Sequence, residues 1–198
     1  MAETVYPVKF SIDYPDRKLK RLTTFFRIFM TIPIFIILGL LVGPSQYNAY
    51  MSGLLTIPTI IMLLFQKKYP KWWFDWNLEL SRFFARISAY LCLLRDEYPS
   101  TDEEQAIHVD ISYPDTTKLS QGLPLVKWFL AIPHYFVLYF LCIAAMIVTI
   151  IAWFVILFTG VYPRGMFDFV VGIYRWSMRV NAYAFILTTD QYPPFSLD

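Results

Sequence analysis

The chain has 198 residues, of which 57% are hydrophobic, 19% aromatic and only 16% charged. Soluble domains carry roughly a quarter charged residues, so this composition excludes an ordinary soluble domain and indicates an integral membrane protein. The formal net charge of +2 is too small to indicate a nucleic-acid partner.

The first half of the chain predicts a strand, a membrane hairpin and an amphipathic helix, in that order. Residues 8–13, VKFSID, alternate apolar and polar side chains as a half-exposed strand does. A membrane helix needs about 20 apolar residues. Residues 23–42 and 51–65 supply two apolar stretches, so we expect a hairpin over about 23–65. Residues 72–94 are largely apolar but carry charges at helical spacing, which predicts an amphipathic helix.

The second half predicts the same order of elements. Residues 100–107 are acidic and lack apolar periodicity, so we interpret them as a linker. A strand is expected from residue 108, because HVDIS alternates apolar and polar side chains. Residues 123–159 are long and apolar enough to cross a bilayer twice, with a tight turn near 141–146. A second amphipathic helix is expected over about 165–187.

These elements form two tandem copies of one unit, at residues 1–99 and 108–198. Three pairs of motifs recur in the same order: FSIDYPD and VDISYPD, RIFMTIP and KWFLAIP, YPKWWFDW and YPRGMFDF. Such self-similarity is typical of an internal repeat. The predicted fold is an all-α integral membrane protein with two tandem repeats. Each repeat is a transmembrane helical hairpin plus an amphipathic interfacial helix, with short β-strand segments on the cytoplasmic side.

Basic residues predict the orientation of the hairpins. All 17 Lys and Arg residues lie outside the two hairpin tips, and short loops rich in Lys and Arg stay in the cytoplasm. Both hairpins are therefore expected to enter and leave from the cytoplasm, giving a multi-pass protein with both termini cytoplasmic. An alternative is that the amphipathic helices also cross the membrane, which would invert the second copy at a high cost in buried charge.

One polar stripe runs along each amphipathic helix. The candidate site residues of the two stripes are Asp75, Arg82, Arg86 and Tyr90, and Asp168, Arg175, Arg179 and Tyr183. Three interpretations stay open. The stripe faces water or lipid headgroups while aromatic residues enter the acyl boundary. In the second interpretation, Asp75 and Arg82, or Asp168 and Arg175, pair between helices and lock the two copies together. In the third, the arginines bind the phosphate of a lipid headgroup or of another phosphate-bearing ligand.

No pattern indicates a catalytic, metal or cofactor site. The only two histidines, His108 and His134, are not spaced as metal or haem ligands, and His134 is expected to be hydrogen-bonded within the membrane. Cys92 and Cys142 lie far apart in apolar surroundings, so we expect both to be buried and free. We expect no enzyme activity and no cofactor.

The motifs carry a family resemblance. The Tyr-Pro-Asp start, the Ile-Pro within an apolar helix, the Phe-Asp followed by spaced arginines and the closing DQYPPF at residues 190–195 resemble the DUF4389 family. That family comprises small bacterial membrane proteins of unknown function, so the resemblance implies a bacterial inner (plasma) membrane and no particular activity. The first copy departs from the pattern at its end, where DEYPS replaces DQYPPF.

Two functions are consistent with this sequence. The first is a non-enzymatic accessory or scaffold subunit of a larger membrane complex, whose partners are membrane lipids and other membrane protein subunits. The second is binding or transport of a lipid or small amphiphile in a cleft between the two copies. Co-purified protein partners favour the first function, and co-purified lipid favours the second.

Overall fold

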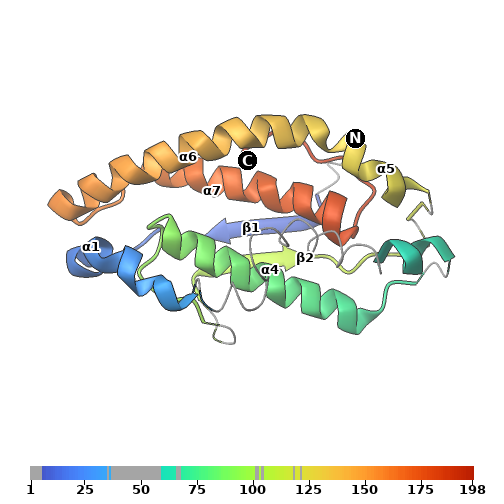
Figure 1. The fold of residues 1–198 in the computed structure, drawn as a ribbon, viewed down its shortest axis with the longest axis horizontal. Helices are drawn as coiled ribbons and strands as arrows, with labels where there is room; N and C mark the ends of the chain where they lie inside the picture. The colour runs from blue at the N-terminus through green and yellow to red at the C-terminus, as the bar shows by residue number, and fades with distance from the viewer. Residues whose placement is uncertain are drawn as a thin grey trace.

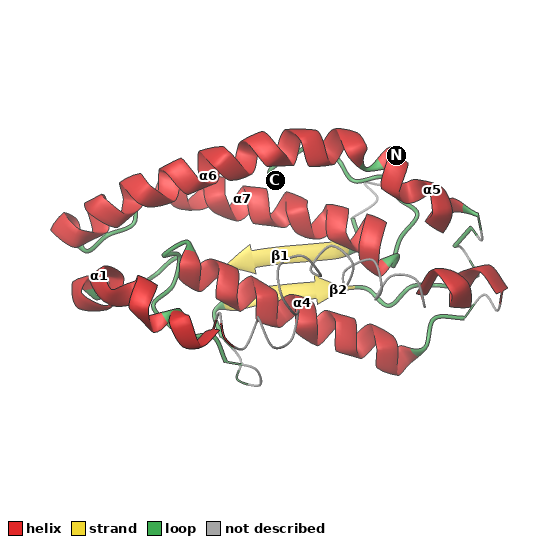
Figure 2. Ribbon diagram, in the orientation of Figure 1, coloured by secondary structure: helices red, strands yellow, loops and turns green. Residues whose placement is uncertain are grey.

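The computed structural model describes residues 6–34, 36, 59–65, 68–100, 103, 105–117, 119–120 and 122–198. Its elements are β1 (Val8–Ile12), α1 (Arg21–Met30), α4 (Lys71–Leu91), β2 (Ile107–Ile111), α5 (Leu123–Leu130), α6 (Ile132–Thr159), α7 (Arg164–Asn181) and η1, a π-helical segment at Ala182–Ile186. The described residues are mostly helical (Figures 1 and 2), which confirms the prediction of a helical fold. Most of the predicted first hairpin, residue 35 and residues 37–58, lies outside the described residues.

The two strands come from opposite halves of the chain and pair with each other. β1 and β2 are antiparallel, with Phe10 opposite Val109. Both strands have the alternating pattern of buried apolar and exposed polar side chains that their sequences predict. The sequence places each strand but contains no signal for this pairing, because about a hundred residues separate them.

Two long helices from opposite halves of the chain pack on the two strands (Figure 1). α7, from the C-terminal half, packs on β1, and α4, from the N-terminal half, packs on β2. α6 packs on the outer side of α7, and α1 packs on α6. Each half therefore places its strand against the helix of the other half, so that the core is shared between the two.

The two long helices begin and end in the same way. Pro70 and Pro163 precede them in extended conformation, because a proline fits the start of a helix but cannot continue one from before. Beyond their last turns, Leu93 and Leu187 adopt left-handed conformations with φ of 63° and 62°. Leucine seldom adopts this conformation, and both side chains are buried, so the surrounding core holds the two chain reversals.

The predicted second hairpin is wrong. α6 is one continuous helix of 28 residues and passes without a break through residues 141–146, where the tight turn was expected. The bend comes earlier, at Ala131, between α5 and α6 and directly before Ile132 and Pro133. A proline removes one helical hydrogen bond and favours a break there, whereas residues 141–146 contain neither glycine nor proline.

α6 is long and apolar enough to cross a membrane. Its most apolar 18 residues have a mean hydropathy of 2.9, and only 11% of them are buried. Its length of about 42 Å exceeds the roughly 30 Å core of a bilayer. A core helix of a soluble protein can be equally apolar, but it would be covered by other elements. This exposed helix is the feature that fits a membrane protein.

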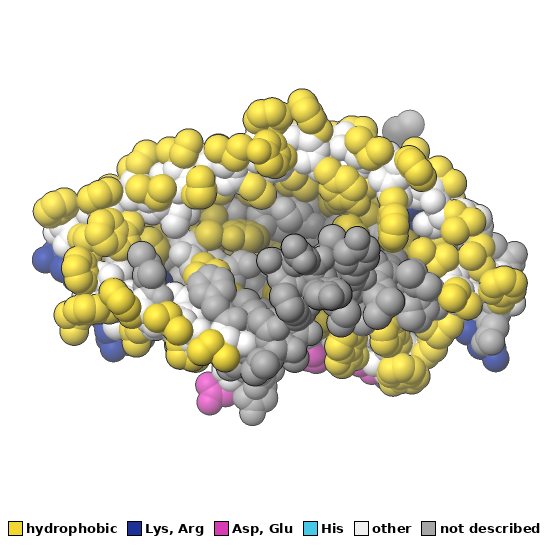
Figure 3. Space-filling view, viewed as in Figure 1, with side chains coloured by type: hydrophobic (Ala, Val, Ile, Leu, Met, Phe, Trp, Pro, Cys, Tyr) yellow, Lys and Arg dark blue, Asp and Glu magenta, His cyan; other side chains and the backbone are white. Residues whose placement is uncertain are grey.

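Exposed apolar side chains continue over α6, α5 and α1. Figure 3 shows them as a broad yellow surface along α6, with Lys and Arg side chains at the two ends of the long axis. Cys142 is among the exposed residues of α6 and Cys92 is half-buried, so the expectation that both cysteines are buried is wrong for Cys142 and met only in part for Cys92. Hydrophobicity alone predicted burial, but on this helix the apolar side chains face outward.

Candidate ligand-binding cleft

The central arginines of the predicted stripes bind the sheet. The Nε of Arg82 on α4 donates a hydrogen bond to the carbonyl oxygen of Val109 (3.1 Å), and the Nε of Arg175 on α7 donates one to Phe10 (3.0 Å). Phe10 and Val109 are the residues that face each other at the centre of the sheet. These two arginines therefore satisfy matching strand carbonyls and fasten each half to the other.

The next arginines bind the segments that leave the helices. Arg86 Nη1 donates to the carbonyl of Ser100 (2.8 Å), and Arg179 Nη1 donates to Ser196 (3.4 Å). The predicted ion pairs are not formed. Arg82 pairs with Glu79 at 2.6 Å, whereas Asp75 and Asp168 are exposed, and Arg164 is the cation nearest to Asp168, at 4.0 Å. The arginines of the stripes therefore face the sheet and the exit segments of the chain.

Arg82 and Arg86 also line a polar cavity of about 590 Å³ beside β2. A phosphate site would need an excess of positive charge there. Among the described residues, the other charged ones that line it are Asp13 and Asp110. Asp13 also lies 3.1 Å from His108 Nε2, and Glu79 is paired with Arg82. Because carboxylates balance the two guanidinium groups, this cavity is poorly suited to an anion. Headgroup binding by the stripe arginines stays a prediction that no contact here supports.

The tyrosines at the ends of the stripes lie against buried cations that the sequence interpretation missed. The guanidinium of Arg27 lies 4.4 Å from the ring centre of Tyr90, and the ammonium of Lys127 lies 5.1 Å from that of Tyr183. A cation over an aromatic face gains about 2 kcal/mol when it is desolvated. Tyr90 and Tyr183 thus belong to two matching polar centres, one in each half.

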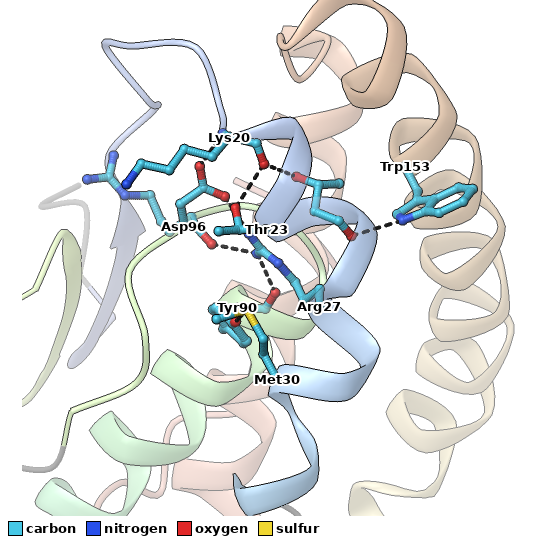
Figure 4. Close-up of polar contacts among 9 residues, drawn as sticks. Lys20, Thr23, Arg27, Met30, Tyr90, Asp96 and Trp153 are labelled. Atoms are coloured by element: carbon cyan, nitrogen blue, oxygen red, sulfur yellow. Dashed lines mark hydrogen bonds and ion pairs between the residues drawn. The ribbon is translucent and has the colours of Figure 1, made fainter.

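In the N-terminal half, the polar centre is the ion pair of Arg27 with Asp96 (Figure 4). Arg27 is only 3% exposed. Its Nη1 donates to the carbonyls of Tyr90 (2.8 Å) and Arg95 (2.7 Å). The second oxygen of Asp96 accepts a hydrogen bond from the backbone nitrogen of Lys20 at the start of α1 (2.7 Å). Among the described residues, nothing accepts a hydrogen bond from the buried Nε of Arg27.

In the C-terminal half, Lys127 and Asp190 form the corresponding pair. The Lys127 ammonium lies 2.8 Å from Asp190 and donates to the carbonyl of Thr189 (2.6 Å). Asp190 also accepts from the backbone nitrogen of Ser120 (2.6 Å), as Asp96 does from Lys20. Lys127 is completely buried. Removing one partner of such a buried pair costs about 3–5 kcal/mol, because the other charge is left uncompensated.

A cleft of about 330 Å³ lies beside Arg27, between the two halves. One wall comes from the N-terminal half and the other from α6 of the C-terminal half. Its lining residues are Thr24, Arg27, Thr31, Leu91, Leu93, Thr149, Ile150, Trp153 and Phe154. Trp153 ties the two walls together, because its indole nitrogen donates to the carbonyl of Thr24 on α1 (3.1 Å; Figure 4). The cleft is mostly apolar, with polar groups gathered near Arg27.

A sequence signal for the two ion pairs does exist. Arg27 and Lys127 are single charges at the same place in RIFMTIP and KWFLAIP, and Asp96 and Asp190 each stand two residues before a closing Tyr-Pro. A lone charge in an apolar helix needs a partner, and the recurring aspartates are matching candidates. The predicted site was instead built on the more numerous charges of the two amphipathic helices.

Other polar side chains outside the two ion pairs fit a structural role. The Cys92 thiol lies 3.0 Å from the Tyr174 hydroxyl, and burial raises the pKa of both groups above their usual values. His134 Nδ1 accepts a hydrogen bond from the indole nitrogen of Trp176 (3.0 Å). Within the described ranges, no three His, Cys, Asp or Glu side chains are grouped so that they could hold a metal ion.

Comparison with known proteins places a family domain in the C-terminal half. Residues 124–196 match the model of the family described as Domain of unknown function (DUF4389). The match runs from the start of α5, through α6 and α7, to the tail that follows Asp190. No curated protein and no solved structure matches the chain. The resemblance to DUF4389 is therefore confirmed for one copy of the motif, the one that contains Lys127 and Asp190.

Proposed function

We propose that this is a non-enzymatic membrane protein that binds a lipid or other small amphiphile in the cleft between its two halves. The cleft itself carries the proposal, because it is lined by both halves and combines apolar walls with one polar end. Ligand sites are usually concave, largely apolar and equipped with a few placed polar groups, and the cleft is at the lower end of their usual size.

The mouth of the cleft favours a ligand that arrives from the membrane. Ile150 and Phe154 line the cleft and are also 53% and 52% exposed on the outward face of α6. An apolar chain in the bilayer could therefore enter beside α6 without first crossing water. The polar end lies deeper, at Arg27, which is itself almost fully buried.

The two halves are proposed to be copies of one unit. The paired contacts of Arg82 and Arg175, and the paired centres of Arg27 and Lys127, support this interpretation. The family model matches one half only. In a duplicated protein the interface between copies is a natural place for a ligand, because each copy can diverge on one side of it.

A bacterial inner membrane with several crossings is the proposed location. α6 is long and apolar enough for one crossing as a single helix, so the proposal needs a further crossing elsewhere in the chain to place both termini in the cytoplasm. Protease treatment of inverted vesicles should remove tags at both ends. Protection of either tag would contradict this topology.

The experiment for the function compares two tryptophan substitutions on α6. Ile150 lines the cleft, whereas Ile147 lies about one turn earlier on α6. The two side chains are almost equally exposed, Ile150 at 53% and Ile147 at 52%. Native mass spectrometry of detergent-purified protein should detect a bound small amphiphile in wild type and in Ile147→Trp, and should lose it in Ile150→Trp. Retention in Ile150→Trp, or no bound amphiphile in wild type, would overturn the proposal.

A second function is favoured by one observation, the exposed apolar face of α6. Phe136, Phe140, Ile147 and Phe158 lie along this face and are 52–78% exposed, and aromatic residues of this kind are common in interfaces with other proteins. The protein would then act as an accessory or scaffold subunit. A stoichiometric partner that co-purifies through this face supports that role, and a chain that purifies alone contradicts it.

A further inference from the structure

Building on the proposed function, we infer that the ligand of the cleft is a neutral amphiphile with a hydroxyl headgroup, such as a long-chain or isoprenoid alcohol or a glyceride. A fatty acid anion is not the preferred ligand. Three observations at the polar end of the cleft lead to this chemistry: its charge balance, its hydrogen-bonding groups and its size.

The charge balance removes the attraction for an anion. Among the described residues, Arg27 is the only charged one that lines the cleft, and its charge is already compensated by Asp96 in a direct ion pair. A carboxylate headgroup beside Arg27 would lie near the Asp96 carboxylate as well. Two carboxylates that share one cation repel each other in a site with little water. A neutral headgroup avoids this repulsion.

The hydrogen-bonding groups at the polar end of the cleft favour a ligand that both donates and accepts hydrogen bonds. Thr24 and Thr149 each use the hydroxyl hydrogen to bond a carbonyl four residues earlier, Lys20 and Ala145. With their hydrogens used in this way, both hydroxyl groups keep only oxygen lone pairs, which accept hydrogen bonds. Arg27 Nε is a buried donor without a partner among the described residues. A hydroxyl is the simplest headgroup that donates to a threonine oxygen and accepts from an N–H group.

The size of the cleft suits one chain. A cavity of about 330 Å³ is at the small end of ligand sites, too small for a phospholipid with two acyl chains. Trp153 and Phe154 provide flat apolar walls, and Leu91 and Leu93 lie opposite them on the N-terminal half. A single alkyl or isoprenoid chain fits between these walls while the remainder extends into the bilayer.

The experiment uses two probes that differ only in the headgroup, 11-bromoundecanol and 11-bromoundecanoate. Bromine quenches tryptophan fluorescence, and Trp153 lines the cleft. In detergent micelles at pH 8, bromoundecanol should quench a saturable component that is missing in Trp153→Phe. Bromoundecanoate should bind at least ten-fold more weakly.

A threonine substitution tests the headgroup contact. Thr149→Val keeps the shape but removes the oxygen, and should weaken binding of the alcohol about five-fold, the effect of one hydrogen bond. Thr159→Val is the control, since Thr159 makes the same kind of bond to Val155 but lies outside the cleft. Equal binding of both probes, or no effect of Thr149→Val, would overturn the hydroxyl inference and leave the proposed function intact. A complete lack of saturable quenching by either probe would contradict both.

Discussion

The polar centres of Arg27 and Lys127 have the same arrangement of groups, but the Arg27 centre is open to a cleft and the Lys127 centre is closed off by packed side chains. Both cations pair with an aspartate and lie against a tyrosine ring, and both aspartates accept a hydrogen bond from the backbone before the neighbouring helix. Lys127 is completely enclosed, whereas Arg27 borders a cleft and keeps one N–H donor without an acceptor among the described residues.

The C-terminal tail accounts for much of this difference. After Asp190, the chain turns back over α7, and Phe195 stacks on His134 with ring centres 4.0 Å apart. Leu197 lies so close to Gly172 that a Cβ there would meet it at 2.9 Å. In the N-terminal half, the exposed Glu79 stands where Gly172 stands, and buried Ile34 replaces His134. There, the chain continues into the linker, whose described residues show no counterpart of the Phe195 ring stacking.

The two matching ion pairs, Arg27–Asp96 and Lys127–Asp190, therefore serve different purposes. In the C-terminal half the pair sits under a packed aromatic cluster and contributes to the stability of the fold. In the N-terminal half it also forms the polar end of a cleft that α6 closes on the other side. If this is correct, the two halves should depend on each other for folding, and the two ion pairs should differ in their contribution to stability.

The largest effect is expected from separating the halves. Each half contributes the strand against which the helix of the other half packs, and Arg82 and Arg175 bond across this boundary. Residues 1–103 and 104–198 expressed separately should therefore aggregate or be degraded. Expressed together, they should co-purify as a one-to-one complex in detergent. A half that folds alone would show that the shared core is not required.

The next effect comes from removing the aspartates. Asp190→Ala leaves Lys127 buried without its counter-ion and should lower the free energy of unfolding by about 3–5 kcal/mol. Asp96→Ala should cost less, because Arg27 keeps two backbone acceptors and the cleft can admit water. Denaturant titration of both variants in the same detergent measures the difference. An equal or larger loss in Asp96→Ala would contradict the open and closed description.

A smaller effect is expected where the tail packs on α7. Gly172→Ala introduces a Cβ that collides with Leu197, and overpacking of this kind costs about 1–3 kcal/mol. The tail should loosen, which proteolysis near the C-terminus would detect as faster cleavage. The matched change Glu79→Ala, at an exposed position, should alter stability by less than about 0.5 kcal/mol. Unchanged cleavage of Gly172→Ala would show that the tail does not cover this helix.

The smallest effect concerns reactivity and leaves stability unchanged. Cys92 is held against Tyr174, and burial raises the pKa of its thiol, so little thiolate is present at pH 8. Cys142 is exposed on α6. In lipid vesicles, a charged, impermeant maleimide should label neither cysteine, because the bilayer covers Cys142 and the fold covers Cys92, and both should react once the protein is unfolded in SDS. Fast labelling of Cys142 by the charged reagent would show that α6 faces water.

Much of the fold follows from local patterns. Alternation at Val8–Ile12 and Ile107–Ile111 marks the strands, and the charges spaced along an otherwise apolar stretch mark α4 and α7. The pairing of β1 with β2 could not be predicted, because it depends on contacts between distant segments. The hairpin prediction for α6 failed because length alone was taken to require two crossings, although no residue within 141–146 breaks a helix.

The site was predicted only in part. The stripe residues Arg82 and Arg175 proved to bind the sheet, because strand carbonyls need donors and the arginines lie within reach. Arg27 and Lys127 were missed as site residues, although their matching places in two motifs were visible. The cleft could not be predicted, since its walls come from residues near 24, 91 and 150 that meet only in the folded chain.

Photolabelling with an alkyl alcohol that carries a diazirine near the end of its chain tests the central claim most directly. Irradiation of the protein in lipid vesicles, followed by peptide mass spectrometry, shows which residues the chain touches. The cleft predicts adducts concentrated on Leu91, Leu93 and Ile150, and their loss in Ile150→Trp. Adducts spread evenly along the outward face from Phe136 to Phe158, with none on Leu91 or Leu93, would show that the amphiphile only surrounds the protein.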